Sequence, residues 1–314
     1  MYWDDLIAQV GNLALTATLY EVSAAPKPGL VDPFSRGAHS DMDYFTFLAS
    51  AAALAPFFVD FARIGAEFAG ESPGLLAELR KLGIEAEKAM YAATQGINTH
   101  KGLIFSMGLA CAAAGKLLVS DRRAEISDRS AVISGCIQEV ADIVSGITIR
   151  ELVPLVEAEM LLASDTIRAK NAVVPSIDLS AGEQSFIKYG IRGVRGEAED
   201  GFPSVINHAL PRLHFDLLAG MSWNDAMVDA LLILYLKVDD TTVLKRAGSD
   251  GLAYVRAQAA AALSRGGMRL MENRDFVQKL DADFSQRGIS PGGCADLLAV
   301  TAFLEMLSSK WIAQ

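Results

Sequence analysis

Cysteine is scarce in this sequence. Three are present among 314 residues, at positions 111, 136 and 294, and no two of them form a CxxC pair. Scattered thiols of this kind supply neither a disulfide framework nor a zinc site, so a reducing compartment is expected. The first ten residues, MYWDDLIAQV, hold two acids and no basic segment, which argues against a signal peptide. Together these absences predict a cytoplasmic protein.

Basic residues are also in deficit. The chain has 28 lysines and arginines against 38 aspartates and glutamates, a formal net charge of −10. A surface of this sign argues against nucleic acid as a partner. It leaves phosphate-bearing small molecules open, because a few local cations or Mg²⁺ can reverse the field inside one cleft. Residues 44–59 are uncharged, but this run is short for a bilayer and contains Pro56. We therefore expect a buried helix there and no membrane span.

The alternation of apolar and polar residues that marks a β-strand is almost missing, since Val173-Val174 is too short to count. Helical spacing is present instead: in 131–149, apolar residues recur every three or four positions. Comparable patterns cover 4–22, 41–69, 75–94, 101–119, 150–169, 203–219, 222–237, 250–264, 270–284 and 291–312. No repeat or linker divides the chain. The sequence predicts an all-α fold, with residues 1–314 in a single compact helical domain.

Polar clusters stand at the breaks between these helices. The most informative is NTHKG, residues 98–102, directly before a long apolar run. A helix that begins here would offer unpaired backbone N–H groups, a positive dipole end and the Lys101 cation, all of which favour a bound phosphate. The alternative is an ordinary helix start with Asn98 or Thr99 as its cap.

Two further clusters carry both signs of charge. Residues 23–43 contain three prolines, the cations Lys27 and Arg36, and His39. The acids of this segment, any of which could reach Mg²⁺ or merely cap a helix, are Asp32, Asp41 and Asp43. Residues 189–205 contain four glycines, which permit close approach of the backbone to a ligand. The charged residues among them are Arg192, Arg195, Glu197, Glu199 and Asp200.

The last two clusters lie near the C-terminus. Asp239 and Asp240 follow an apolar helix and precede Lys245 and Arg246. Acid pairs near phosphate ligands commonly hold Mg²⁺, although a helix stop followed by a cap would look the same. Residues 290–293, SPGG, make an open helix start with Ser290 as cap and Pro291 at the first helical position.

Taken in order, these clusters resemble the triphosphoribosyl-dephospho-CoA synthase family, whose members serve citrate lyase and malonate decarboxylase. The resemblance covers about residues 14–307 and rests on PKPGLVD (26–32), GAHSDMD (37–43), NTHKG (98–102), GVRGEAEDGFP (193–203), DTTVLKRAG (240–248) and SPGGCADLLA (290–299). It implies a helical, Mg²⁺-dependent enzyme. The implied reaction moves the triphosphoribosyl group of ATP to the 2′-hydroxyl of 3′-dephospho-CoA and releases adenine. Thr242, Ala247 and Cys294 depart from the family pattern and leave substrate preference open.

This chemistry needs a clamp on the triphosphate, help for the departing adenine and a base for the incoming hydroxyl. We hypothesise that Glu197 is the base and that His39 or His100 protonates adenine or binds phosphate. Candidate substrate-binding residues are Lys27, Asn98, Thr99, Lys101, Arg195, Lys245, Arg246, Ser290, Gly292 and Gly293. Candidate Mg²⁺ ligands are Asp32, Asp41, Asp43, Asp239 and Asp240.

Two other functions stay open at this point. Another all-α Mg²⁺ enzyme, such as an ADP-ribose glycohydrolase, would also combine helices with paired aspartates. A nucleotide-binding relative without activity would share the clusters as well. The resemblance further implies a downstream holo-carrier-protein transferase as a partner, and an alanine-rich helical body is compatible with a homodimer. Which carrier-dependent enzyme is served is not encoded in these motifs.

Overall fold

The computed structural model describes residues 2–70, 72–120, 129–148, 186 and 189–312. Every regular element in these ranges is helical, which confirms the predicted all-α class. The helix expected at 150–169 lies outside the described residues. The α-helices are α1 (Tyr2–Ser23), α2 (Tyr44–Glu67), α3 (Ser72–Ala93), α4 (Lys101–Ser120), α5 (Arg129–Thr148), α8 (Gly193–Glu199), α9 (Leu210–Leu218), α10 (Trp223–Lys237), α11 (Thr241–Ser264), α12 (Met271–Gln286) and α13 (Gly292–Ile312). A π-helical turn, Val205–Ala209, and a 3₁₀ turn, Gly267–Arg269, complete the set.

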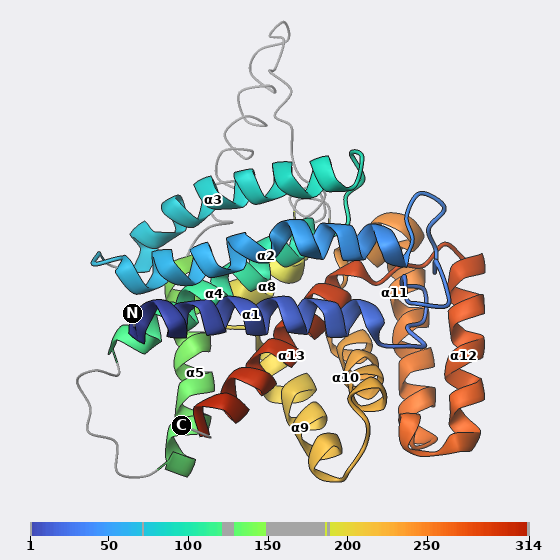
Figure 1. The fold of residues 1–314 in the computed structure, drawn as a ribbon. Helices are drawn as coiled ribbons and strands as arrows, with labels where there is room; N and C mark the ends of the chain where they lie inside the picture. The colour runs from blue at the N-terminus through green and yellow to red at the C-terminus, as the bar shows by residue number, and fades with distance from the viewer. Residues whose placement is uncertain (1, 71, 121–128, 149–185, 187–188, 313–314) are drawn as a thin grey trace, which may run out of the picture.

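Helices α1, α2 and α4 run alongside one another, with α3 on the outer side of α2 and α4 (Figure 1). Small residues let these backbones approach closely. A Cβ added at Gly65 of α2 would lie 1.9 Å from the carbonyl oxygen of Ala112 in α4, and one added at Gly115 would lie 2.0 Å from that of Ala62. Any side chain at either glycine would separate α2 from α4, so the tight pairing of the two helices depends on both.

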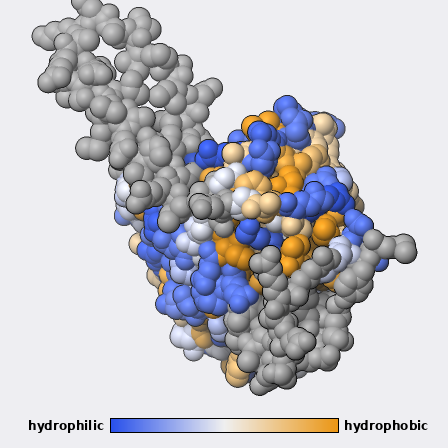
Figure 2. Space-filling view, turned by 90° about the vertical axis from the view of Figure 1, so that its left-hand side faces the viewer, coloured by the Kyte–Doolittle hydropathy of each residue, from blue (hydrophilic) through white to orange (hydrophobic). Residues whose placement is uncertain are grey.

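Helix α13 crosses this layer and also contacts α5, α9 and α10 (Figure 1). By length and composition α2, α4 and α13 could each cross a membrane. The apolar stretches of α4 and α13 are 72% and 78% buried inside the protein, whereas that of α2 is only 33% buried. The helix expected to be buried at 44–59 is therefore buried on one face only. Separately, apolar side chains gather in the middle of the molecular face shown in Figure 2.

The irregular segment 24–43 connects α1 to α2 and is fastened to helices far along the chain. The hydroxyl of Tyr235 in α10 donates to the carbonyl oxygen of Pro28 (2.8 Å), and Asp281 of α12 accepts the N–H of Gly29 (3.0 Å). Gly29 has φ +79°, and a Cβ there would lie 2.3 Å from the carbonyl oxygen of Ile289. The segment thus holds its polar residues against the start of α13.

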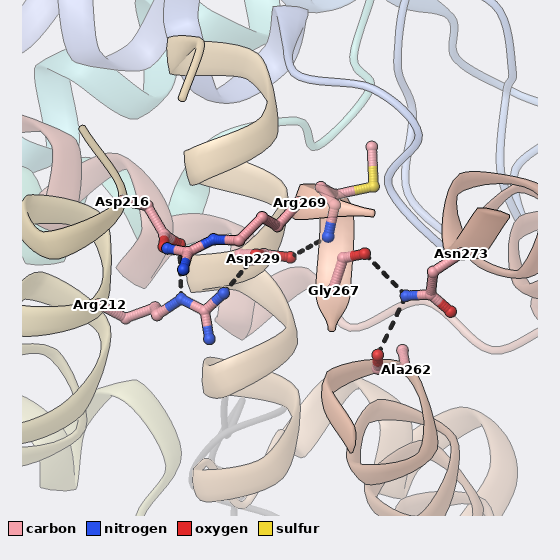
Figure 3. Close-up of polar contacts among 8 residues, drawn as sticks. Arg212, Asp216, Asp229, Ala262, Gly267, Arg269 and Asn273 are labelled. Carbon is pink, nitrogen blue, oxygen red and sulfur yellow. Dashed lines mark hydrogen bonds and ion pairs between the residues drawn. The ribbon is translucent and has the colours of Figure 1, made fainter. Parts of the chain in front are cut away.

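A network of ion pairs joins α9, α10 and the 3₁₀ turn away from that segment (Figure 3). The side chains of Asp216 and Asp229 are fully buried, and the Arg212 guanidinium donates to both. Arg269 also donates to Asp216 (2.7 Å), and the N–H of Met268 donates to Asp229 (2.7 Å). Burial raises the pKa of Asp229 to about 6, against the opposing effects of Met268 and Arg212. Each buried carboxylate is thereby matched by donors, as such groups require.

Candidate active site

A cavity of about 990 Å³ opens between segment 24–42, helix α3 and the N-terminal turns of α4 and α13. Many of the residues predicted to bind substrate meet here, although they come from four separate parts of the sequence. Those that line it are Lys27, His39, Asn98, Thr99, His100, Lys101, Arg195, Ser290, Gly292 and Gly293. The cavity therefore brings the two predicted helix starts, NTHKG and SPGG, to one place.

The start of α4 is built by a local cap. The amide oxygen of Asn98 accepts the backbone N–H of Lys101 at 3.3 Å, and the Lys101 ammonium pairs with Glu87 of α3 at 2.9 Å. Both members of that pair line the cavity. The two interpretations of NTHKG, a helix cap and a ligand-binding turn, are thus compatible. Asn98 caps the helix while the first turn still faces the cavity.

His100 is the most enclosed polar residue of this turn, at 2% exposure. Its Nδ1 lies 2.7 Å from the hydroxyl of Ser50 in α2, and that hydroxyl accepts a hydrogen bond from Thr99 (2.8 Å). With its oxygen accepting from Thr99, the Ser50 hydroxyl can donate to Nδ1, which places the imidazole proton on Nε2. His100 Nε2 is buried and has no hydrogen-bond partner among the described residues. A bound ligand in the cavity would supply that partner.

Burial, and secondarily the charge of Lys27, lower the pKa of His100 to about 3. The ring is then neutral at pH 7 and acts as an N–H donor, not as an acid. We expect its ring ¹⁵N signals in NMR to stay constant between pH 5 and 8 in the folded protein. In urea the same signals should titrate near the ordinary value of about 6.5. A folded-state midpoint between pH 5 and 8 would contradict this assignment.

A buried ion pair lies beside this ring. The Lys27 ammonium contacts Glu21, at the end of α1, at 2.5 Å, and the two side chains are 2% and 4% exposed. Burial raises the pKa of the Glu21 carboxyl, while Lys27 opposes the rise. Both side chains line the cavity, so an anion bound there would meet an ammonium already held in place.

The start of α13 is tied to the start of α11 through Asp240. Its carboxylate caps α11 by accepting the N–H groups of Thr242 (2.8 Å) and Val243 (3.0 Å), and it also accepts the N–H of Cys294 (2.8 Å). Three backbone donors thus occupy a residue that was predicted to bind Mg²⁺. The structure uses Asp240 to position the SPGG turn.

His39 reaches that turn from segment 24–43. Its Nε2 lies 2.9 Å from the Ser290 hydroxyl and 3.3 Å from Arg246, whose guanidinium also donates to the carbonyl oxygen of Ala38 (2.9 Å). Burial, followed by the charge of Arg246, lowers the pKa of His39, and Asp41 opposes that effect. Arg246 therefore contacts His39 and does not line the cavity. Lys245, which is exposed, does not line the cavity either.

The other predicted Mg²⁺ ligands do not converge. Asp32 accepts the N–H groups of Lys27, Phe34 and Ser35 at 2.8–3.1 Å. Asp43 caps α2 and pairs with Arg36, and Asp239 pairs with Arg256. Asp41 is exposed and lies 3.6 Å from His39. Within the described residues no three His, Cys, Asp or Glu side chains could hold a metal ion together.

Glu197, the predicted base, also lies apart from the cavity lining. Its carboxylate accepts the N–H (3.0 Å) and the hydroxyl (2.6 Å) of Ser204, which fastens α8 to the following turn. Burial raises the pKa of this carboxyl despite these bonds. The glycine-rich sequence around Glu197 suggested contact with a ligand. In the structure its carboxylate instead has a structural role, through its bonds to Ser204.

We therefore expect Glu197→Gln to leave kcat within about twofold and to lower the free energy of unfolding by about 1 kcal/mol, because only the charge-assisted part of two hydrogen bonds is lost. Steady-state kinetics and urea unfolding would measure the two effects. A loss of kcat without a loss of stability would restore Glu197 to the mechanism.

Asp296 is the main residue that sequence reasoning missed. It lies in the first turn of α13 and lines the cavity, with its carboxyl directly against α4. A Cβ added at Gly102 would lie 2.0 Å from its Oδ2. Burial, then the charges of Glu21 and Asp240, hold the pKa of Asp296 well above its usual range, against a backbone hydrogen bond from Leu103. Burial thus favours the protonated form of this carboxyl.

One sequence signal could have revealed it. Asp296 is the first acid after SPGG, in an otherwise apolar run that continues to Glu305. An isolated acid in such a run must be buried, paired or functional. The other polar lining residues outside the predicted set are Glu21, Arg80, Glu87, Arg192, Thr241 and Thr242.

Comparison with known proteins agrees with the family resemblance seen in the sequence motifs. Residues 7–314 match the model of a family described as ATP:dephospho-CoA triphosphoribosyl transferase. Proteins from two strains of Vibrio cholerae, each named as a probable 2-(5''-triphosphoribosyl)-3'-dephosphocoenzyme-A synthase, are 41% identical over 293 residues, which is 93% of this chain and 86% of theirs. A solved structure from Archaeoglobus fulgidus, described as a triphosphoribosyl-dephospho-CoA synthase, is 19% identical with a TM-score of 0.46, covering 84% of this chain and 99% of that one.

Proposed function

Because this chain belongs to the ATP:dephospho-CoA triphosphoribosyl transferase family, we propose that its cavity is the active site for that transfer. The triphosphoribosyl group of ATP moves to the 2′-hydroxyl of 3′-dephospho-CoA, and adenine leaves. The observation that carries this assignment is the meeting of two helix N-termini at one cavity that also contains the buried Lys27–Glu21 pair and Asp296. Each of the six family motifs contributes residues to the cavity lining.

The first turns of α4 and α13 bind the triphosphate. Each brings the positive end of a helix dipole to the same space, while Asn98 and Asp240 already accept the N–H groups of Lys101 and Cys294. Lys27, Lys101 and Arg195 line that space and add positive charge. Glu21 holds the Lys27 ammonium and Glu87 holds the Lys101 ammonium, so both cations are in place at the space that the triphosphate occupies. His100 Nε2 donates one further hydrogen bond to the bound nucleotide.

Asp296 supplies the proton that adenine needs. In the transfer the bond from ribose C1′ to adenine nitrogen breaks, its electron pair leaves with adenine, and a new bond forms from C1′ to the acceptor oxygen. Burial raises the pKa of the Asp296 carboxyl and so favours a proton on it, and this carboxyl donates that proton to the departing adenine. The proton released by the acceptor hydroxyl passes to solvent, from which the carboxyl is restored.

Mg²⁺ enters with ATP in this proposal. The five predicted carboxylates do not converge on one ion: Asp32, Asp43 and Asp240 accept backbone N–H groups, Asp239 pairs with arginine, and Asp41 is exposed beside His39. Phosphate oxygens and water are sufficient ligands, since Mg²⁺ keeps several waters and is usually bound through substrate phosphates. Its chemistry is to neutralise charge on the triphosphate.

The test is to incubate the protein with ATP, 3′-dephospho-CoA and Mg²⁺ and to follow free adenine and product mass. We expect adenine only when the acceptor is present, together with a triphosphoribosyl mass gain on the acceptor. Removal of Mg²⁺ with EDTA should suppress the reaction. Adenine without acceptor would identify a glycohydrolase instead, and nucleotide binding without adenine would indicate a relative that does not turn over.

The product is a precursor of the prosthetic group of an acyl carrier protein. We propose that a holo-carrier-protein transferase consumes it in the cytoplasm, on behalf of citrate lyase or malonate decarboxylase. The genes beside this one would distinguish those two enzymes.

A further inference from the structure

The cavity has two chemically different ends. The polar end is the one described above, at the starts of α4 and α13. The other end extends along one face of α3, whose lining residues recur at helical spacing: Leu76, Leu79, Arg80, Gly83, Ile84 and Glu87. From Leu76 to Glu87 is 11 residues, or about 16 Å at the helical rise of 1.5 Å per residue. The cavity is therefore an elongated channel.

The facing wall of this channel is also apolar. It is formed by Phe105, Gly108 and Leu109 of α4 and by Phe61 of α2. The Glu87–Lys101 ion pair stands where the apolar walls meet the polar end. Ile84 is 54% exposed although it lines the cavity, which places it at the mouth. A largely apolar channel, with the exposed Arg80 as a charged residue of its α3 wall, thus leads outward from the polar end between α3 and α4.

We propose that this channel, lined by Leu76, Leu79, Gly83, Ile84, Phe105 and Leu109, binds the pantetheine arm of 3′-dephospho-CoA. The inference rests on the proposed function and deepens it. Both substrates are adenosine nucleotides with charged phosphates, and the acceptor differs by a long, flexible arm with methyl and methylene groups. That arm is long enough to bury apolar surface along the whole channel, at about 25 cal/mol per Å². The channel then distinguishes the two nucleotides.

Gly83 makes the proposal testable. A Cβ added there meets no atom within 4 Å, so the position faces open space inside the channel. Elsewhere in the same lining, a Cβ at Gly108 would lie 3.0 Å from the Phe61 ring. A larger side chain at Gly83 can therefore fill the channel without displacing the protein, and replacement of a helical glycine favours the helix.

The experiment measures dissociation constants by calorimetry for ATP, 3′-dephospho-CoA and ADP, which is the acceptor without its arm. Gly83→Phe should raise the dissociation constant of 3′-dephospho-CoA by about tenfold or more, because a filled pocket excludes its ligand. ATP and ADP should change less than about twofold, and Gly83→Ala should behave like the wild type. Ile84→Lys, at the exposed mouth, is a second variant with the same expected direction, at a side chain that is already 54% exposed.

Weaker ATP binding with unchanged 3′-dephospho-CoA binding would overturn the proposal and place the adenine of ATP in the channel. Unchanged binding of all three ligands in both Gly83→Phe and Ile84→Lys would overturn it as well. These readouts require no turnover. A wild-type protein that binds 3′-dephospho-CoA more tightly than ADP but releases no adenine would retain the channel and refute the proposed function.

Discussion

Replacing Asp296 by asparagine is expected to lower kcat by about 10²–10⁴-fold, the range for loss of a general acid. Asparagine keeps the size of the side chain and can still accept the backbone hydrogen bond from Leu103. It has no proton that it can transfer to adenine at neutral pH. Because the triphosphate is held by other groups, the dissociation constant of ATP should change little. Stopped-time assays of adenine release and calorimetric titration with ATP would separate the two quantities.

The matched control is Asp60→Asn in α2. Asp60 is 46% exposed in its side chain and pairs with Arg63 of its own helix, so this variant makes the same chemical change outside the cavity. Its kcat should equal that of the wild type. If Asp296→Asn also kept wild-type turnover, Asp296 would not be the proton donor and another group would have to assist adenine.

Replacing Arg212 by methionine is expected to lower the free energy of unfolding by about 3–5 kcal/mol, the usual cost of removing one partner from a buried ion pair. Arg212 is the residue that bridges Asp216 and Asp229 (Figure 3). Asp216 would retain Arg269, but Asp229 would retain only the N–H of Met268. Urea unfolding followed by circular dichroism would measure the loss.

This loss should depend on pH. Arg212 holds the pKa of Asp229 down, so the variant raises that pKa further above the unfolded value. The folded variant then binds more protons than the unfolded chain, and its stability falls as pH rises. The deficit against wild type should be smaller at pH 5 than at pH 7.5. Arg63→Met, which breaks an exposed pair, should show neither effect. An equal deficit at both pH values would show that Asp229 is not the group left unpaired.

Local signals explain why part of the site could be predicted. The start of α4 is specified by a neighbouring residue, Asn98, and the starts of α4 and α13 both face the cavity. The all-α class follows from apolar spacing in the same way. What no local pattern contains is which face of α3 or α13 turns inward, because helix packing decides that. The isolated acid Asp296 could have been noticed in the sequence, but its place in the cavity and that of Gly83 are seen only in the assembled fold.

The carboxylates show a different limit. An acid directly before a helix has the same sequence appearance whether it caps the helix or binds a cation. Asp43 and Asp240 were both predicted to bind Mg²⁺, and both cap helices by accepting backbone N–H groups. Glu197 was placed in the mechanism because of its glycine-rich surroundings, but its partner is Ser204. Spatial partners distinguish these roles, and a sequence does not contain them.

If the first turns of α4 and α13 together hold the triphosphate of ATP, bound ATP must protect both turns from hydrogen exchange. Mass spectrometry with and without ATP and Mg²⁺ measures that exchange directly. We predict slower exchange in peptides that cover residues 98–104 and 290–296, and unchanged exchange in α12, residues 271–286. Protection of only one helix start, or of neither while ATP is bound elsewhere, would contradict the account.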